Sequence, residues 1–188
     1  MRVLVVSGSL RAGSHNTSLA RAAVEAAPEG VEVELWEGIG DLPIYHQDVD
    51  DAGEAPASVV RLREDWAAAD AILFVTPEYN GSVPGGLKNA IDWASRPKFE
   101  SALTNKTVAV AGASTGQFGA LWAQTDLKKI LGAAGARVVG AEIPVSRAHE
   151  KHDSEGRLLD GEVFEQLRLQ LATLAAEAAV PDTAVNAA

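Results

Sequence analysis

A loop near the start of the chain carries residue types that can bind an anion. It reads Gly8-Ser9-Leu10-Arg11-Ala12-Gly13-Ser14-His15-Asn16-Thr17 and follows the apolar run Val3–Val6. Arg11 supplies a fixed positive charge, and the hydroxyl and amide side chains around it supply neutral donors. A helix that begins at the end of this loop adds free backbone N–H groups and the positive end of its dipole. The loop therefore predicts a phosphate site, although serine and asparagine here could equally serve only as caps of the helix.

The same loop restricts the kind of phosphate that it could bind. The spacing of Gly8 and Gly13 matches the phosphate loop of nucleotide hydrolases, but Ser14 and His15 stand where that motif needs lysine and a hydroxyl residue. Leu10 stands where the dinucleotide fingerprint needs its second glycine. A triphosphatase and a dinucleotide site of that type are both excluded, and a terminal monophosphate is favoured.

Two further loops follow apolar runs and are rich in glycine, proline and small polar residues. One reads Thr76-Pro77-Glu78-Tyr79-Asn80-Gly81-Ser82-Val83-Pro84-Gly85-Gly86, and the other spans residues 113–119. A stiff backbone edge beside an aromatic ring is suited to a flat heterocycle with polar edges. The alternative is a tight turn before a helix, with Tyr79 packed as a core residue.

Strand and helix patterns alternate along the chain and must position these loops. The expected strands are Val3–Val6, Val31–Trp36, Ala71–Val75, Thr107–Ala111 and Arg137–Ile143. The expected helices are Thr17–Ala27, Ala57–Ala69, a segment from Leu87 to Ala94, a segment from Leu127 to Ala134, and Glu162–Ala179. Such alternation predicts an α/β fold: a five-stranded parallel sheet between two layers of helices, in a three-layer α/β/α sandwich.

The second expected strand favours one strand order over another. Glu32 and Glu34 alternate with apolar residues, which is typical of an exposed edge strand. The second strand is an edge in the flavodoxin-like order 2-1-3-4-5, whereas it is interior in the longer dinucleotide-binding order. With the first order, the three loops converge beyond the carboxyl ends of strands one, three and four. We expect one domain over residues 1–180, with 181–188 as a loose tail and 38–56 as either a lid or a plain variable loop.

Composition excludes several other classes of protein. The 188 residues carry 16 Lys and Arg against 26 Asp and Glu, a formal charge of −10, so neither nucleic acid nor a membrane surface is an expected partner. The chain has no cysteine, and its first apolar run is too short for a signal-peptide core. A cytoplasmic protein is expected. His149 and His152 do not have the spacing of a zinc motif, and no metal is predicted.

The three loops together resemble the NADPH-dependent FMN reductase family, which also includes quinone, chromate and azo-compound reductases. The resemblance rests on Gly8-Ser9-Leu10-Arg11 with Ser14 and Asn16, on Thr76-Pro77-Glu78-Tyr79-Asn80 with the following Leu87-Lys88-Asn89-Ala90-Ile91-Asp92-Trp93, and on Ala113-Ser114-Thr115-Gly116. It runs in order to about residue 140. Gln117 and Phe118 depart from the family pattern, in which further glycine is common.

The resemblance implies a flavodoxin-like fold that binds FMN at the switch point of the sheet. Carried over by position, the phosphate would be held by Ser9, Arg11, Ser14 and Asn16. The edge of the isoalloxazine ring would be lined by Pro77, Glu78, Tyr79 and Asn80, and its pyrimidine side would be closed by Ser114, Thr115 and Gly116. No side chain is expected to act as a catalytic residue, because the flavin itself carries the chemistry.

The expected activity is hydride transfer from NADPH or NADH through FMN to a quinone, a free flavin or another small acceptor. The alternative is an electron carrier of flavodoxin type without substrate turnover of its own. A homodimer or homotetramer is expected, partly because Trp93 is predicted to be exposed beside the apolar face that begins at Leu87. All four tryptophans are predicted to lie in the core or at a subunit interface rather than against a flavin: Trp36, Trp66, Trp93 and Trp122.

Overall fold

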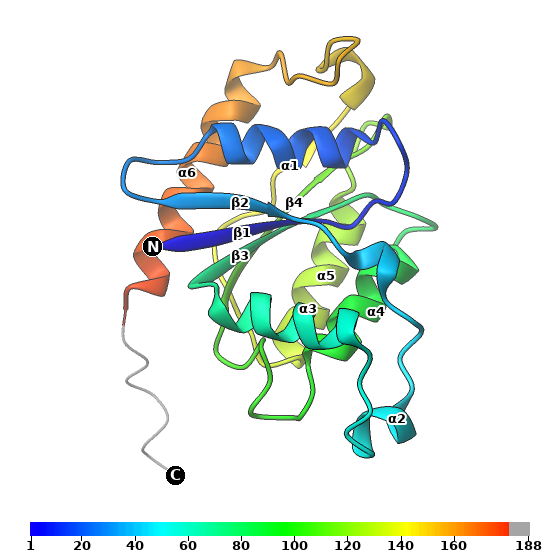
Figure 1. The fold of residues 1–188 in the computed structure, drawn as a ribbon. Helices are drawn as coiled ribbons and strands as arrows, with labels where there is room; N and C mark the ends of the chain where they lie inside the picture. Colours follow the sequence, from blue (N-terminus) through cyan, green and yellow to red (C-terminus); the bar gives the residue numbers. More distant parts are fainter. Residues whose placement is uncertain (181–188) are drawn as a thin grey trace.

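The computed structural model describes residues 1–180, and a parallel sheet lies at its centre (Figure 1). The strands are β1 (Arg2–Ser7), β2 (Glu32–Trp36), β3 (Ala71–Thr76), β4 (Thr107–Ala113), β5 (Arg137–Val138) and β6 (Pro144–Val145). Their order is β2-β1-β3-β4-β5, with β6 also paired to β4. The predicted flavodoxin-like order 2-1-3-4-5 is confirmed. The predicted tail 181–188 lies outside the described residues.

Burial along the strands explains the order. Every residue of β3 and β4 is buried, as expected for strands covered on both faces. On β2 only Val33 and Trp36 are buried, and Glu34 pairs with Arg2 of β1 at 2.9 Å. The alternation of glutamates therefore marks the edge strand, as predicted.

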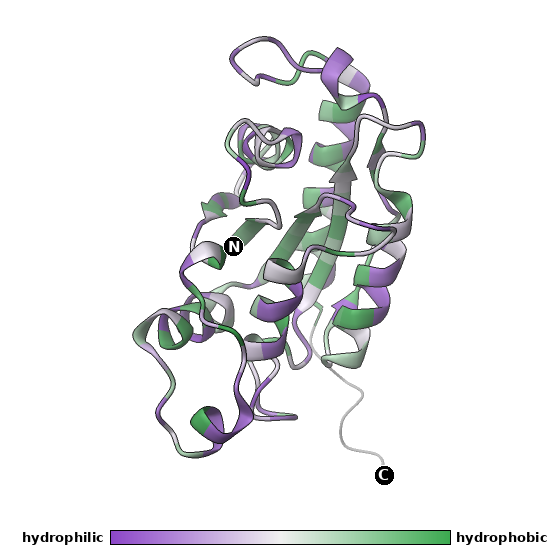
Figure 2. Cartoon of the chain, turned by 90° about the vertical axis from the view of Figure 1, so that its right-hand side faces the viewer, coloured by the Kyte–Doolittle hydropathy of each residue, from purple (hydrophilic) through white to green (hydrophobic). Residues whose placement is uncertain are grey.

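Two helical layers cover the sheet. Helices α1 (His15–Glu25) and α6 (Gly161–Ala178) pack on one face, and α3 (Ala57–Ala68), α4 (Gly85–Ala94) and α5 (Leu121–Ala133) pack on the other. Short helices η1 (Ile39–Asp41), α2 (Gln47–Asp51) and η2 (Ala148–Glu150) lie in the connections. In Figure 2 the central strands are mostly green, and purple residues lie on the outer sides of the helices. No helix within residues 1–180 is long and apolar enough to cross a membrane.

The fifth strand differs from the prediction. A single strand over Arg137–Ile143 was expected, but β5 ends at Val138 and the chain returns to β4 only at β6. Gly140, with φ of +72°, lies between them in the left-handed region, which an extended strand does not adopt. The expected strand is therefore split into two short pairings with β4, and the sheet has six strands.

The connection from Gly38 to Pro56 is fixed to the body of the protein. Asn89 of α4 accepts the N–H of Tyr45 at 2.8 Å and donates to the carbonyl of Pro43 at 2.9 Å. Arg63 of α3 donates to both oxygens of Asp50 at 2.8 Å. These contacts hold the segment against α3 and α4, so it is a packed part of the domain.

The tryptophans occupy two kinds of position. Trp36, Trp66 and Trp93 are buried, which confirms the core prediction for Trp36 and Trp66. The prediction that Trp93 is exposed is wrong: its indole packs edge-on against Tyr45, and its N–H donates to the carbonyl of Pro43. The segment 38–56 covers it, so Trp93 carries no argument for a subunit interface.

Gly119 offers a test of how β6 is fixed to β4. A methyl group at this position would lie 2.4 Å from the carbonyl carbon of Pro144, and φ is +58°. We expect Gly119→Ala to lower the free energy of unfolding by about 3 kcal/mol, from the strained backbone and the overpacking together. Urea denaturation measures it.

The matched control is Gly132→Ala, in the last turn of α5, where an added methyl group meets nothing within 4 Å. This change should raise stability by about 0.5–1 kcal/mol, because alanine is the better helix former. Equal effects of the two substitutions would contradict the packing described for Gly119.

Candidate active site

The three predicted loops meet at the carboxyl ends of β1, β3 and β4. They enclose a cavity of about 240 Å³. Its lining residues are Ser9, Arg11, Ser14, His15, Asn16, Pro77, Glu78, Tyr79, Ala113, Ser114 and Thr115. All of the predicted site residues except Asn80 and Gly116 belong to this lining, and those two are chain neighbours of lining residues. His15 and Ala113, which were not predicted as site residues, also line the cavity.

The loop from β1 to α1 presents the positive end of a helix. Ser14 is the N-cap of α1, and its Oγ accepts the N–H groups of Asn16 at 3.2 Å and Thr17 at 3.5 Å. Its hydroxyl hydrogen has no acceptor within residues 1–180. The first turn of α1 contains no acidic residue. Ser14 therefore caps α1, as the alternative expected, and its hydroxyl hydrogen and the helix dipole remain available to an anion.

Arg11 is the charged member of this loop. It is exposed, and its guanidinium donates only to the carbonyl of Ala12, at 3.2 Å, among the residues that the structure describes. Its backbone N–H donates to Oγ of Ser9 at 3.4 Å. A cation that forms no ion pair beside a helix N-terminus has the character of an anion site.

Asn16 has a structural role that sequence spacing could not indicate. Its Nδ2 donates to the carbonyl of Ala113 at 2.9 Å, and its Oδ1 accepts the N–H of Ala113 at 2.8 Å. Both bonds are buried, and they join the first helix to the end of β4. The side chain braces two loops of the site, and one amide hydrogen remains for a ligand.

The loop after β3 holds Tyr79 away from the core. Tyr79 and Ser82 exchange backbone hydrogen bonds at 3.0 and 3.2 Å across a tight turn, in which Asn80 and Gly81 have φ of +54° and +77°. Both central residues at positive φ are typical of a type I′ turn. Tyr79 is 51% exposed, so the alternative that it is a core residue is wrong.

Glu78 and Ser82 tie this turn to α5. Helix α5 starts after Ala120, whose side chain cannot cap it, and Oε2 of Glu78 accepts the N–H of Ala123 in its first turn at 3.3 Å. Ser82 donates to the carboxylate of Asp126 on the same helix. Glu78 thus supplies a cap from another loop, a role that differs from lining a ring edge.

The third loop, 114–119, is supported by β6 and by the residues that follow it. Ser114 donates to the carbonyl of Val145 at 3.1 Å, and the N–H of Arg147 donates to the carbonyl of Gly116 at 3.0 Å. The N–H groups of Thr115 and Gly116 have no acceptor within the described chain. Phe118 and Trp122 form an exposed aromatic pair beside this loop, with ring centroids 4.7 Å apart.

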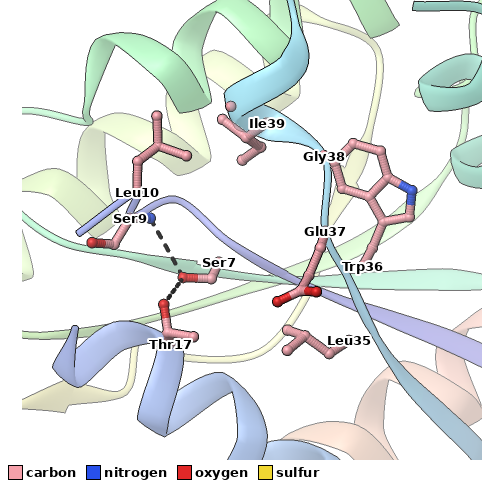
Figure 3. A pocket seen from close by; sticks show the side chains of 10 residues that line it. Ser7, Ser9, Leu10, Thr17, Leu35, Trp36, Glu37, Gly38 and Ile39 are labelled. Carbon is pink, nitrogen blue, oxygen red and sulfur yellow. Dashed lines mark hydrogen bonds between the residues drawn. The ribbon is translucent and has the colours of Figure 1, made fainter. Parts of the chain in front are cut away.

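A second, smaller cavity of about 130 Å³ lies between the first loop and the residues at the end of β2 and after it (Figure 3). Apolar side chains of Leu10, Trp36 and Ile39 line much of it. Two of its hydroxyl side chains bond to each other, since Oγ of Ser7 lies 3.0 Å from Oγ1 of Thr17, and Oγ of Ser7 also accepts the N–H of Ser9 at 3.4 Å. The sequence analysis did not predict this cavity.

His15 is a titratable side chain of the loop between β1 and α1 that lines the larger cavity. Burial lowers its pKa below the usual 6.5, and electrostatic interactions with His152, Arg11 and His149 lower it further. Its ring lies beside that of His152, with centroids 5.4 Å apart. No three side chains suited to metal ligation come together within residues 1–180.

The chain is similar to known flavin-dependent oxidoreductases over most of its length. Residues 1–150 match the family described as NADPH-dependent FMN reductase. An NAD(P)H-dependent FMN reductase of Pseudomonas aeruginosa is 44% identical over 175 residues, 93% of this chain and 93% of that protein. A quinone reductase of Escherichia coli is 44% identical over 131 residues, 70% of this chain and 69% of the relative. The structure of FerB, a flavoenzyme NAD(P)H:(acceptor) oxidoreductase of Paracoccus denitrificans, has a TM-score of 0.83 at 36% identity, covering 94% of this chain and 96% of that chain.

The brace between Asn16 and Ala113 can be tested by stability. Asn16→Ala leaves the buried N–H and carbonyl of Ala113 without partners, so we expect the free energy of unfolding to fall by about 2 kcal/mol. Chemical denaturation measures the change. The control is Gln47→Ala, where an exposed amide bonds only to Asp51 at 3.3 Å and the expected change is within about 0.5 kcal/mol. A loss for Asn16→Ala no larger than that of the control would show that the two loops do not depend on this side chain.

Proposed function

This chain belongs to the NADPH-dependent FMN reductase family, and we propose that it transfers hydride from NADPH or NADH through FMN to a quinone, a free flavin or another small acceptor. The observation that carries the proposal is the cavity at the switch point of the sheet, where an anion site and a rigid polar edge face each other. Open parallel sheets bind their ligands at this position. The enzyme is an oxidoreductase, and its cofactor is FMN.

The residues at the cavity fit the two ends of FMN. The guanidinium of Arg11 and the hydroxyl hydrogens of Ser9 and Ser14 have no strong internal partners, which is what a dianionic phosphate requires. Asn16 keeps one amide hydrogen for the same anion while it braces the loop. These four side chains form the proposed phosphate site.

The opposite wall of the cavity fits a flat ring with polar edges. The free N–H groups of Thr115 and Gly116 can donate to carbonyl oxygens on the pyrimidine side, where Ser114 closes the wall. On the β3 side the stiff backbone of Pro77, Glu78, Tyr79 and Asn80 lines the ring edge. Because the carboxylate of Glu78 caps α5, Glu78 contributes to the ring site through its backbone.

When bound, FMN supplies the hydride-accepting and electron-donating chemistry. The contribution of the chain is placement: it binds the phosphate, fixes the plane of the ring and leaves one approach open beside Tyr79. The exposed Tyr79 and the pair of Phe118 and Trp122 offer flat surfaces for a second planar molecule. No side chain of the site is required to act as nucleophile or base.

We further propose that one domain, residues 1–180, binds one FMN, and that the protein is a cytoplasmic homodimer or homotetramer. Support for assembly comes from Phe118 and Trp122, which are 55% and 53% exposed beside the cavity. Large aromatic side chains that remain exposed together are typical of interface centres. A partner subunit at this position would help to wall the flavin site. The cytoplasmic location is supported by the absence of cysteine from the sequence.

Steady-state oxidation of NADPH tests the activity. The purified protein with FMN and a small quinone should oxidise NADPH continuously without any partner protein. A chain that binds FMN but turns over only when an electron-transfer partner is added would be the flavodoxin-type carrier instead.

Arg11 provides a test of where the phosphate lies. Hydrogen bonds to charged groups contribute about 1.5–3 kcal/mol each, so Arg11→Ala should weaken FMN binding by about one to two powers of ten. Riboflavin has no phosphate, and its affinity should hardly change. Titrations of apoprotein with both flavins measure this, and Arg21→Ala on the exposed side of α1 is the control. Equal weakening of both flavins would make Arg11 a structural residue of the loop.

Assembly can be tested at Trp122. Light scattering of the wild-type protein should give two or four times 19.6 kDa at micromolar concentration. Trp122→Glu places a charge in the proposed interface and should shift the mass toward that of one chain. Leu169→Glu, at an exposed position on α6, should leave the mass unchanged. A wild-type mass near 19.6 kDa would refute the oligomer.

A further inference from the structure

His15 lies where an anion in the cavity would meet it. It is the first residue of α1, and it lines the cavity together with Arg11 and Ser14. The family resemblance assigned it no role, because it lies between the two residues that carry the motif, Ser14 and Asn16. Among the side chains that line the cavity within residues 1–180, its imidazole is the one whose charge changes near neutral pH.

A second histidine, His152, packs against the ring of His15. Nδ1 of His152 lies 2.8 Å from the carbonyl of Ala148, and because a carbonyl only accepts, Nδ1 carries the hydrogen. Nε2 of His152 is buried and has no hydrogen-bond partner in the described chain. The ring of His15 packs against this one at 5.4 Å with an interplanar angle of 36°. His15 is therefore held in place by the segment that follows β6.

The ionisable groups nearest His15 all disfavour its protonated form. Arg11 approaches from its own loop, His149 lies on η2, and His152 follows η2. The carboxylate that lines the same cavity, Glu78, is bonded to the first turn of α5.

The acidic groups of the supporting segment are already paired with neighbouring cations. The pairs are Glu150 with Arg147 and His149, Asp153 with Arg157, and Asp160 with Lys151. Without a ligand, burial, Arg11 and the two neighbouring histidines disfavour the protonated form of His15, and no free carboxylate of the supporting segment favours it. Its pKa is lowered accordingly, so it is mainly neutral at pH 7.

We propose that His15 gains a proton when the phosphate of FMN enters the cavity, so that flavin binding takes up a proton and adds a second cation beside Arg11. The inference rests on the proposed function. A dianion next to the imidazole reverses the balance of charge around it and favours the imidazolium. The proton comes from the buffer and is held on the ring nitrogen of His15 that faces the phosphate.

The sign of the pH dependence follows from linkage. Because the pKa of His15 is higher in the complex than in the apoprotein, binding takes up protons between the two pKa values, and affinity falls as pH rises through the higher one. The phosphate of free FMN has a second pKa of about 6, so binding of its dianion releases protons. The two effects have opposite signs, and net uptake at pH 7 identifies the histidine.

Isothermal titration of apoprotein with FMN at pH 7, in buffers of different ionisation enthalpy, measures the protons exchanged. We expect wild-type protein to take up about half a proton or more with FMN and none with riboflavin. His15→Asn should abolish the uptake and weaken FMN binding about tenfold. His15→Lys, which is already charged, should bind FMN tightly without uptake. His46→Asn, at an exposed position before α2, should behave as wild type.

The outcomes separate this inference from the proposed function. Tight FMN binding with no uptake, or with net release, would overturn the role of His15 and leave the FMN site intact. Uptake that persists in both His15 variants would assign the proton to another group and also overturn it. Failure of wild-type protein to bind either flavin would contradict the proposed function itself.

Discussion

Two buried hydrogen bonds between Asn16 and the backbone of Ala113 hold the site together. They join the loop after β1 to the end of β4, 97 positions apart in the chain, and so they set the distance between the proposed phosphate site and the proposed ring site. Close packing reinforces this constraint, since a methyl group on Gly112 would lie 2.7 Å from the carbonyl of Thr76 on β3. These contacts fix the relative positions of three loops that are distant in sequence, so the loops form one rigid cavity.

The electrostatics of the molecule are divided between its surface and its cavity. The chain has a formal charge of −10, yet the cavity gathers Arg11, His15 and the positive end of α1 at one end. Carboxylates near this end are used internally, as with Glu78 at α5 and Asp160 at Lys151. An acidic protein can in this way keep a local anion site, because the nearby negative charges are already paired.

The sequence predicted the parts of the fold that depend on local pattern. Alternating Glu32 and Glu34 identified the edge strand, and apolar runs identified the buried strands, because burial on one or two faces leaves a direct signal in the sequence. The prediction for Trp93 was wrong because a segment with no periodicity, 38–56, folds over it and is anchored by Asn89. The fifth strand was predicted to be too long, because a pattern of apolar residues does not reveal the left-handed backbone at Gly140.

The same distinction applies to the site. The three loops and their common edge of the sheet could be predicted from spacing and topology, whereas the contacts that join these loops to distant segments could not. Nothing in the residue types marks Glu78 as the cap of α5 or His152 as the support of His15, since each contact joins segments that meet only in the folded chain. A histidine between two motif residues was the one available signal for His15, and the resemblance gave it no role.

The central claim is that this cavity holds FMN in a position to receive hydride from a nicotinamide. Anaerobic addition of NADPH or NADH to the FMN-loaded protein, freed of unbound flavin by gel filtration, tests it most directly. The account predicts that about one FMN remains bound per chain and that its visible absorption band is bleached within seconds to minutes by a nicotinamide donor. Flavin that is lost on the column, or that stays bound and oxidised in excess NADPH and NADH, would contradict it.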